Sequence, residues 1–182
     1  MMGKFVKMII LSAVIFVLTA CSSEINTDAD TASKAAAEKK NEGDFAQEFD
    51  LEEVKGNTYR LSDYEGKKVY IKFWASWCPI CLAGLEELNE LSGEKQDFVV
   101  LTVVAPGYNN EKDSESFKKW FNGVENTSNI IVLLDKNGSI TKKYNVRGYP
   151  TSAYIGSDGV LVKTQPGHVS NEQIKNEFEN IE

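Results

Sequence analysis

Two cysteines, Cys78 and Cys81, have the spacing that thiol redox chemistry uses. They stand where an apolar, strand-like run ends and a helical pattern begins. A thiol at the start of a helix faces unsatisfied backbone N–H groups, which favour its thiolate and lower its pKa. Pro79 suits the first helical position because it needs no N–H and its φ angle is preset. The pattern predicts Cys78 as an exposed nucleophile and Cys81, three residues on along the same helical face, as a sheltered second thiol.

This arrangement supports dithiol–disulfide exchange, in which Cys78 attacks a disulfide and Cys81 resolves the mixed disulfide. Two other interpretations use the same residues. Half of a zinc site is one, but three Cys and a single histidine, His168, leave a tetrahedral zinc ion short of ligands. A purely structural disulfide is the other, although a bridge over so short a loop constrains the unfolded chain little. We expect no metal and no cofactor.

The composition describes one acidic globular domain with a tail. The chain has 182 residues, 27 Asp and Glu against 20 Lys and Arg, and a formal charge of −7. This excess of acid provides no basic surface of the kind that nucleic-acid binding requires. A hydrophobic content of 42% is enough for a packed core, so the sequence is not that of a wholly disordered chain.

The N-terminus resembles the signal peptide of a bacterial lipoprotein. Lys4 and Lys7 precede an uncharged run, residues 8–20, that is too short to span a membrane. The run ends in Leu18-Thr19-Ala20-Cys21, which resembles the lipobox, where the cysteine becomes the new N-terminus and receives diacylglycerol. The resemblance implies lipidation of Cys21 and anchoring to the extracytoplasmic face of the cell membrane. An ordinary secretory signal is the alternative.

We therefore divide the chain into three parts: a signal peptide at 1–20, a lipidated flexible tether at 21–44, and a folded domain at 45–182. The tether is assigned from composition, because residues 22–44 contain no aromatic side chain and only one Ile. Such a segment buries too little apolar surface to offset its chain entropy.

Hydrophobic periodicity within 45–182 predicts an α/β domain with a mixed sheet between helices. Strand-like runs cover 49–51, 58–61, 69–75, 98–105, 130–134, 152–155 and 160–162. Helical patterns cover the segment from Pro79 to Gly93, residues 114–121 and the segment after Ser170. In the first of these helices, leucines recur at a three-residue spacing from Leu82 to Leu91.

Two motifs resemble those of the thioredoxin superfamily, specifically its membrane-anchored TlpA/ResA-like branch. The first is the run from Phe73 to Cys81, and the second is Val146-Arg147-Gly148-Tyr149-Pro150-Thr151, which matches the family's cis-proline loop. Residues 134–138 and 157–160 extend the match. The resemblance implies a thioredoxin-like fold: a central mixed β-sheet flanked by helices, with an N-terminal β-hairpin and a crossover insertion within 106–129.

The resemblance also implies roles for individual residues. The Tyr149–Pro150 bond should be cis and face the cysteines, with the backbone of Tyr149 pairing with an incoming peptide. Trp77 should shield the pair, while Trp74 belongs mostly to the core. The residues assigned to substrate contact are Trp77, Pro79, Ile80, Tyr149 and Pro150.

Two positions depart from the family pattern. Lys72 stands where thioredoxins usually carry a buried Asp, and Gly84 stands where the ResA-like branch often carries a Glu. The usual proton acceptor for the second thiol is therefore missing. Either Glu86 or Glu87 approaches the sulfurs or water replaces it; a solvent-facing stripe is the simpler role for both. The Lys72 ammonium either lies near the sulfurs, where it favours thiolates, or extends to the surface.

The predicted activity is that of an extracytoplasmic thiol–disulfide oxidoreductase acting as a reductase. Because an oxidising exterior has no soluble reducing pool, the resemblance implies a DsbD/CcdA-like polytopic thiol transporter as electron donor. The predicted client is a methionine sulfoxide reductase, whose cycle ends in a disulfide, or else apocytochrome c. A disulfide-forming oxidase and a non-enzymatic binding module with a thioredoxin fold are the alternatives.

Overall fold

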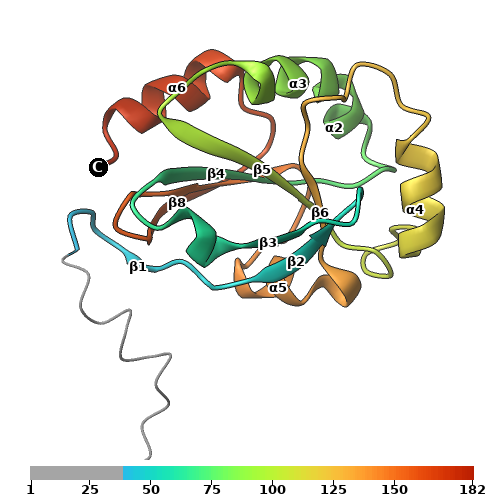
Figure 1. Cartoon of the computed structure of the whole chain (residues 1–182), viewed down its shortest axis with the longest axis horizontal. Helices are drawn as coiled ribbons and strands as arrows, with labels where there is room; N and C mark the ends of the chain where they lie inside the picture. The colour runs from blue at the N-terminus through green and yellow to red at the C-terminus, as the bar shows by residue number, and fades with distance from the viewer. Residues whose placement is uncertain (1–38) are drawn as a thin grey trace, which may run out of the picture. The chain divides into compact units, whose positions relative to one another are not determined.

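Eight strands form one mixed sheet in the computed structural model, which describes residues 39–182 (Figure 1). Their order across the sheet is β1-β8-β7-β4-β5-β6-β2-β3. The three parallel strands at the centre are β4 (Lys68–Phe73), β5 (Phe98–Val104) and β6 (Val132–Leu134). The antiparallel strands are β1 (Asp44–Phe45), β2 (Asp50–Glu53), β3 (Thr58–Arg60), β7 (Thr151–Ile155) and β8 (Val160–Pro166).

Helices lie on both sides of this sheet. They are α2 (Pro79–Ala83), α3 (Leu85–Gly93), α4 (Ser114–Phe121), α5 (Ser139–Lys143) and α6 (Asn171–Glu179), with short 3-10 turns at Leu61–Tyr64 and Lys136–Gly138. In Figure 1, α2, α3 and α6 lie together over one face, and α5 lies on the other. The predicted thioredoxin-like fold is confirmed, including the β2–β3 hairpin and the α4 crossover between β5 and β6.

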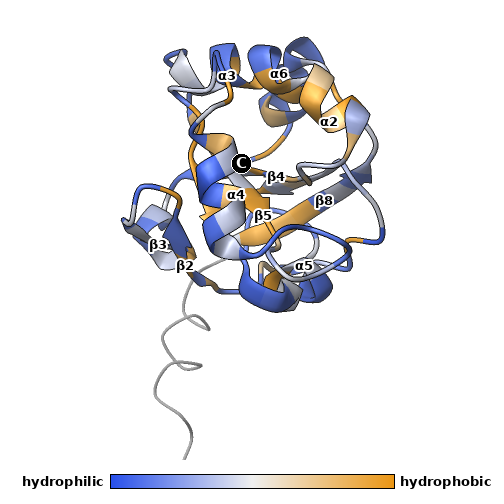
Figure 2. Cartoon of the chain, turned by 90° about the vertical axis from the view of Figure 1, so that its right-hand side faces the viewer, coloured by the Kyte–Doolittle hydropathy of each residue, from blue (hydrophilic) through white to orange (hydrophobic). Residues whose placement is uncertain are grey.

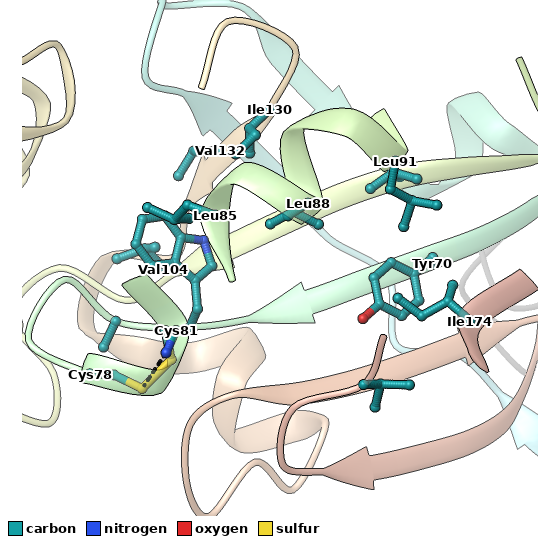
Figure 3. Close-up of a cluster of buried hydrophobic side chains, with 14 of the residues drawn as sticks. Tyr70, Cys78, Cys81, Leu85, Leu88, Leu91, Val104, Ile130, Val132 and Ile174 are labelled. Carbon is teal, nitrogen blue, oxygen red and sulfur yellow. Dashed lines mark hydrogen bonds between the residues drawn. A yellow bond between two sulfur atoms is a disulfide. The ribbon is translucent and has the colours of Figure 1, made fainter. Parts of the chain in front are cut away.

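The central strand β4 is buried on both faces, which explains its dense apolar sequence. Because side chains alternate along a strand, Tyr70 packs with the leucines of α3 in one cluster of buried side chains. Ile71 and Phe73 belong to a second cluster, with Ile140 and Tyr144 at α5. Figure 3 shows the first cluster, with the cysteine pair at one end and Tyr70 further inside. The redox pair is thus part of the core-facing surface of α2.

The prediction of one continuous helix up to Gly93 was wrong, because Gly84 divides it. Gly84 ends α2 and begins α3, with its N–H donating to the carbonyl groups of Cys81 and Leu82. The ring of His168 lies 3.3 Å from the point that a Cβ on Gly84 would occupy. A side chain here would therefore press on that ring. Leu82 is 37% exposed, so it does not belong to the core with the other leucines.

The folded part also begins earlier than the predicted boundary at Phe45. The backbone N–H groups of Lys40 and Asn41 donate to the Asp158 carboxylate at 2.7 and 2.8 Å. Asp44 then pairs with Leu161 as β1 joins the edge of the sheet. Residues 39–44, which composition assigned to the tether, are therefore attached to the domain by hydrogen bonds with the β7–β8 turn. Composition missed this because the segment is held by polar contacts rather than by apolar burial.

Candidate active site

Cys78 and Cys81 are joined by a disulfide at the start of α2, directly after β4. Their Cα atoms are 5.2 Å apart. Cys78 is the N-cap residue, Pro79 occupies the first turn, and the backbone N–H of Cys81 donates to the Cys78 sulfur at 3.3 Å (Figure 3). A side-chain acceptor at this position satisfies one of the N–H groups that a helix leaves unpaired. When the disulfide opens, the same N–H group favours a thiolate on Cys78.

The two sulfurs are less accessible than the sequence suggested. Cys78 is 3% exposed and Cys81 is 2% exposed, although Cys78 was predicted to be open to solvent. Two contacts account for this: the Cys78 sulfur is bonded to Cys81 and lies 3.7 Å from the carbonyl oxygen of Tyr149. A partner disulfide therefore has to approach past the residues that surround the pair.

The loop before β7 lies against the disulfide although it is 71 positions away in the sequence. The Tyr149–Pro150 peptide bond is cis, as the family resemblance implied. Antiparallel pairing of β4 with β7 sets Phe73 opposite Thr151. The last residue of β4, which precedes the cysteines, therefore lies beside the first residue of β7, which follows the cis-proline loop. The ring of Trp77 meets that of Tyr149 edge-on, with centroids 5.9 Å apart, and burial raises the pKa of the Tyr149 phenol.

Apolar side chains protrude around this pair. Trp77 is 48% exposed and Ile80 is 51% exposed, and with Leu82 they are the large hydrophobic residues exposed in the described part of the chain. Helix α2 is accordingly coloured orange over most of its length in Figure 2. Trp74, by contrast, is 1% exposed and packs among the aromatic rings of α4. An exposed apolar patch beside a reactive group is typical of a surface that docks another protein.

Comparison with known proteins decides the family. Residues 41–181 match the sequence family described as Redoxin. The chain belongs to the redoxin family. Within it, this redoxin is a thioredoxin-like protein of the TlpA/ResA type and a thiol–disulfide oxidoreductase. Its disulfide-bonded Cys78–Cys81 pair is consistent with this activity.

Individual relatives agree with this assignment. The redoxin is 30% identical to the thiol-disulfide oxidoreductase ResA of Geobacillus kaustophilus over 185 residues, 99% of each chain. The crystal structure of the exposed lipoprotein thioredoxin Etrx1 from Streptococcus pneumoniae is 48% identical and matches with a TM-score of 0.71, over 74% of this chain and all of that one. The N-terminal domain of PilB from Neisseria gonorrhoeae is 30% identical, with a TM-score of 0.66, over 71% of this chain and 87% of that one.

Two further observations concern the membrane. Cys21, the predicted lipidation site, lies outside the described residues. Among residues 39–182, no helix is both long enough and apolar enough to cross a bilayer.

Lys72 is buried beneath the helices and does not extend to the surface. It is 4% exposed and lies on β4 between Tyr70 and Trp74, opposite Ser152 of β7 and Thr102 of β5. Burial lowers the pKa of the Lys72 amine, and the charge of Glu87 on α3 partly opposes this shift. The redoxin thus buries a base at the position where the family pattern led us to expect a buried Asp.

The two candidate glutamates have different positions. Glu86 is exposed, as a solvent-facing stripe requires. Glu87 is partly buried between α3 and α6, where it pairs with His168 at 3.4 Å and accepts the backbone N–H of Asn171 at 2.8 Å. His168 lies in the loop before α6, as expected. Within residues 39–182, the polar partners of Glu86 and Glu87 are Asn126, Asn171 and His168 rather than the cysteines.

Sequence reasoning missed one buried carboxylate close to the pair. Glu111 accepts hydrogen bonds from the backbone N–H and the hydroxyl of Ser76, both at 2.6 Å. Ser76 comes two residues before Cys78, within the motif that was identified. Nothing in the sequence marks Glu111 as its partner, because an acid in a polar loop has no periodicity or spacing that points 35 residues back.

Replacement of Lys72 by Met tests the buried amine. We expect Lys72→Met to raise the free energy of unfolding at pH 7 by about 1–3 kcal/mol, because it removes an amine that is desolvated and has no hydrogen-bond partner among residues 39–182. The folded-state pKa is lowered, so the unfolded chain binds more protons and wild-type stability rises with pH towards 10.5. The advantage of Lys72→Met should therefore shrink as the pH rises, measured by urea unfolding at pH 7 and 9.5. Exposed Lys67→Met is the control, and a loss of stability in Lys72→Met at pH 7 would contradict the assignment.

Proposed function

We propose that this redoxin is an extracytoplasmic, membrane-anchored reductase of client protein disulfides. The observation that carries the proposal is the hydrogen bond from the Cys81 N–H to the Cys78 sulfur beside the cis-proline loop. In the reduced protein, this donor favours a Cys78 thiolate at neutral pH. Cys78 is therefore the attacking sulfur, and Cys81 is the resolving one.

The exchange balances in two steps. The Cys78 thiolate attacks one sulfur of the client disulfide, which forms a mixed disulfide and releases the other client sulfur as a thiolate. Cys81 then loses its proton and attacks the Cys78 sulfur, which releases the second client sulfur and closes the Cys78–Cys81 bond. The client gains two electrons, and the redoxin ends in the oxidised form that the structure describes.

The client docks on the apolar surface around the pair. Trp77, Pro79 and Ile80 are exposed beside the disulfide and provide apolar contact. The Tyr149 carbonyl, 3.7 Å from the Cys78 sulfur, marks where the backbone of Tyr149 meets an extended client segment. Pro150 is buried, and its contribution is a loop without an N–H group beside the sulfurs.

The anchor is the lipid on Cys21, and the likeness to a structure described as an exposed lipoprotein thioredoxin supports this location. Outside the cytoplasm the redoxin needs reducing equivalents from across the membrane. We propose a DsbD/CcdA-like polytopic thiol transporter as their source. The proposed client is a methionine sulfoxide reductase, with apocytochrome c as the second candidate.

Trapping identifies the attacking sulfur and the client together. In Cys81→Ala, Cys78 attacks but no resolving thiol follows, so mixed disulfides should accumulate and run as larger species on a non-reducing gel. Mass spectrometry of these species names the client. Cys78→Ala is the matched control and should trap nothing. Equal trapping by the two variants would refute the assigned order of attack.

The reduction potential tests the direction of exchange. A reductase should equilibrate with glutathione or dithiothreitol near the thioredoxin value of about −270 mV, because it must donate electrons to client disulfides. A potential near about −120 mV, typical of strong oxidants, would show that the protein forms disulfides instead. The measurement follows the Cys78–Cys81 pair by alkylation and mass spectrometry in defined redox buffers.

The anchor is tested with Cys21→Ala. Without the acylated cysteine, the protein should leave the membrane fraction and lose incorporation of labelled fatty acid, while the potential of the Cys78–Cys81 pair stays unchanged. Cys81→Ala, expressed in parallel, should keep its label. A Cys21→Ala protein that still carries the label would overturn the lipidation site.

A further inference from the structure

The turn that delivers Cys78 to the helix start is held by a residue far away in sequence. Residues 75–78 form this turn, which we call the redox turn: the N–H of Cys78 donates to the carbonyl of Ala75 at 3.2 Å. Ser76 and Trp77 are the two central residues of this turn. The conformation of the redox turn decides where the Cys78 sulfur lies and how the Trp77 ring is presented.

The Glu111 carboxylate binds both donors of Ser76. The Ser76 N–H donates to Oε2 and the Ser76 hydroxyl donates to Oε1, each at 2.6 Å, and the Lys112 N–H donates to Oε1 at 2.7 Å. Glu111 is 7% exposed and Ser76 is 6% exposed. Hydrogen bonds to a charged acceptor that is shielded from water are stronger than neutral ones and costly to lose. The redox turn is thus attached to the β5–α4 connection.

That connection is itself well defined. The N–H of Gly107 donates to the Lys112 carbonyl at 3.1 Å, and the N–H of Glu111 donates to the Tyr108 carbonyl at 3.0 Å. The Lys112 ammonium donates to the Ser76 hydroxyl at 2.6 Å and lies 5.1 Å from the centre of the Trp120 ring. The Ser76 hydroxyl therefore donates a hydrogen bond to the Glu111 carboxylate and accepts one from the Lys112 ammonium.

This contact matters most when the disulfide is open. In the oxidised protein the covalent bond to Cys81 also fixes the position of Cys78. On reduction this covalent link is lost, and the position of Cys78 depends on the redox turn. Disulfide exchange needs three sulfurs in line, and a displacement of about 1 Å in such a site can cost about a hundredfold in rate. The Glu111–Ser76 hydrogen bonds do not involve either sulfur, so they can persist through the cycle.

We propose that Glu111 is a positioning residue that acts through Ser76 to keep Cys78 at the helix N-cap in the reduced protein. The proposal rests on the thiol–disulfide oxidoreductase activity of the family and holds for either direction of exchange. Loss of the Glu111 carboxylate lets the redox turn relax, so that Cys78 loses the Cys81 N–H and its thiolate becomes less stable.

The test measures the reactivity of Cys78 with a small alkylating reagent and with a model disulfide substrate, so the physiological client need not be known. The reduced full-length protein is alkylated with iodoacetamide across a pH series, and the Cys78 peptide is followed by mass spectrometry. In Glu111→Ala we expect the apparent pKa of Cys78 to rise, and the rate constant for reduction of the disulfides of insulin to fall about tenfold or more. Glu111→Gln keeps an acceptor at only one of the two oxygen positions and turns an NH2 group towards a donor at the other, so it should recover only part of both.

Two further variants separate positioning from general stability. Glu115→Gln removes the same charge from an exposed glutamate of α4 that lies 3.8 Å from Lys118, and it should leave the pKa and the rate unchanged. Ser76→Ala should also raise the apparent pKa of Cys78 and lower the rate constant. The double variant Ser76→Ala/Glu111→Ala should be no slower than Glu111→Ala alone.

The opposite results would overturn the proposal. A Glu111→Ala protein with a lower melting temperature but an unchanged Cys78 pKa and rate would show a purely structural role. Additive losses in the double variant would show that Glu111 does not act through Ser76. If Glu111→Ala fails to fold, an unchanged Cys78 pKa and rate in Ser76→Ala refute the proposal.

Discussion

The chemistry proposed for this protein depends on one backbone hydrogen bond, from the Cys81 N–H to the sulfur of Cys78. The donor exists because a helix leaves its first N–H groups unpaired, and the sulfur reaches it because Cys78 is the N-cap residue. The same geometry that closes a disulfide also stabilises a thiolate once the disulfide opens. One local arrangement therefore serves both redox states, and the rest of the site keeps that arrangement in place.

The sheet supplies the second half of the site. Antiparallel pairing of β4 with β7 brings the cis Tyr149–Pro150 bond next to the helix start. The Tyr149 carbonyl covers the Cys78 sulfur from one side, and Trp77 and Ile80 protrude beside it. The nearly covered disulfide and the apolar side chains around it thus lie together, and this is the surface on which we propose that the client docks.

Two buried ionisable side chains near this site show how context decides their effect. Lys72 has no hydrogen-bond partner among residues 39–182, and burial lowers the pKa of its amine. Glu111 is also buried, but three donors face its carboxylate, which makes it a firm attachment for the redox turn. A desolvated charge destabilises the fold when it is alone, whereas one with matched donors fixes local geometry.

Sequence alone predicted the order of the main strands and helices, though not β1 or α5, together with the thioredoxin-like fold and the place of the cysteine pair before a helix. It could do so because strand and helix periods and the CxxC and cis-proline motifs are local patterns. It also predicted a helix that the structure divides at Gly84, where the His168 ring from another segment fills the space for a side chain. The burial of Lys72 and of the cysteines, the anchoring of residues 39–44 and the Glu111–Ser76 contact were decided by tertiary structure. Each depends on groups far apart in the chain, whose distances and solvent exposure are set only when the sheet assembles and the helices pack against it.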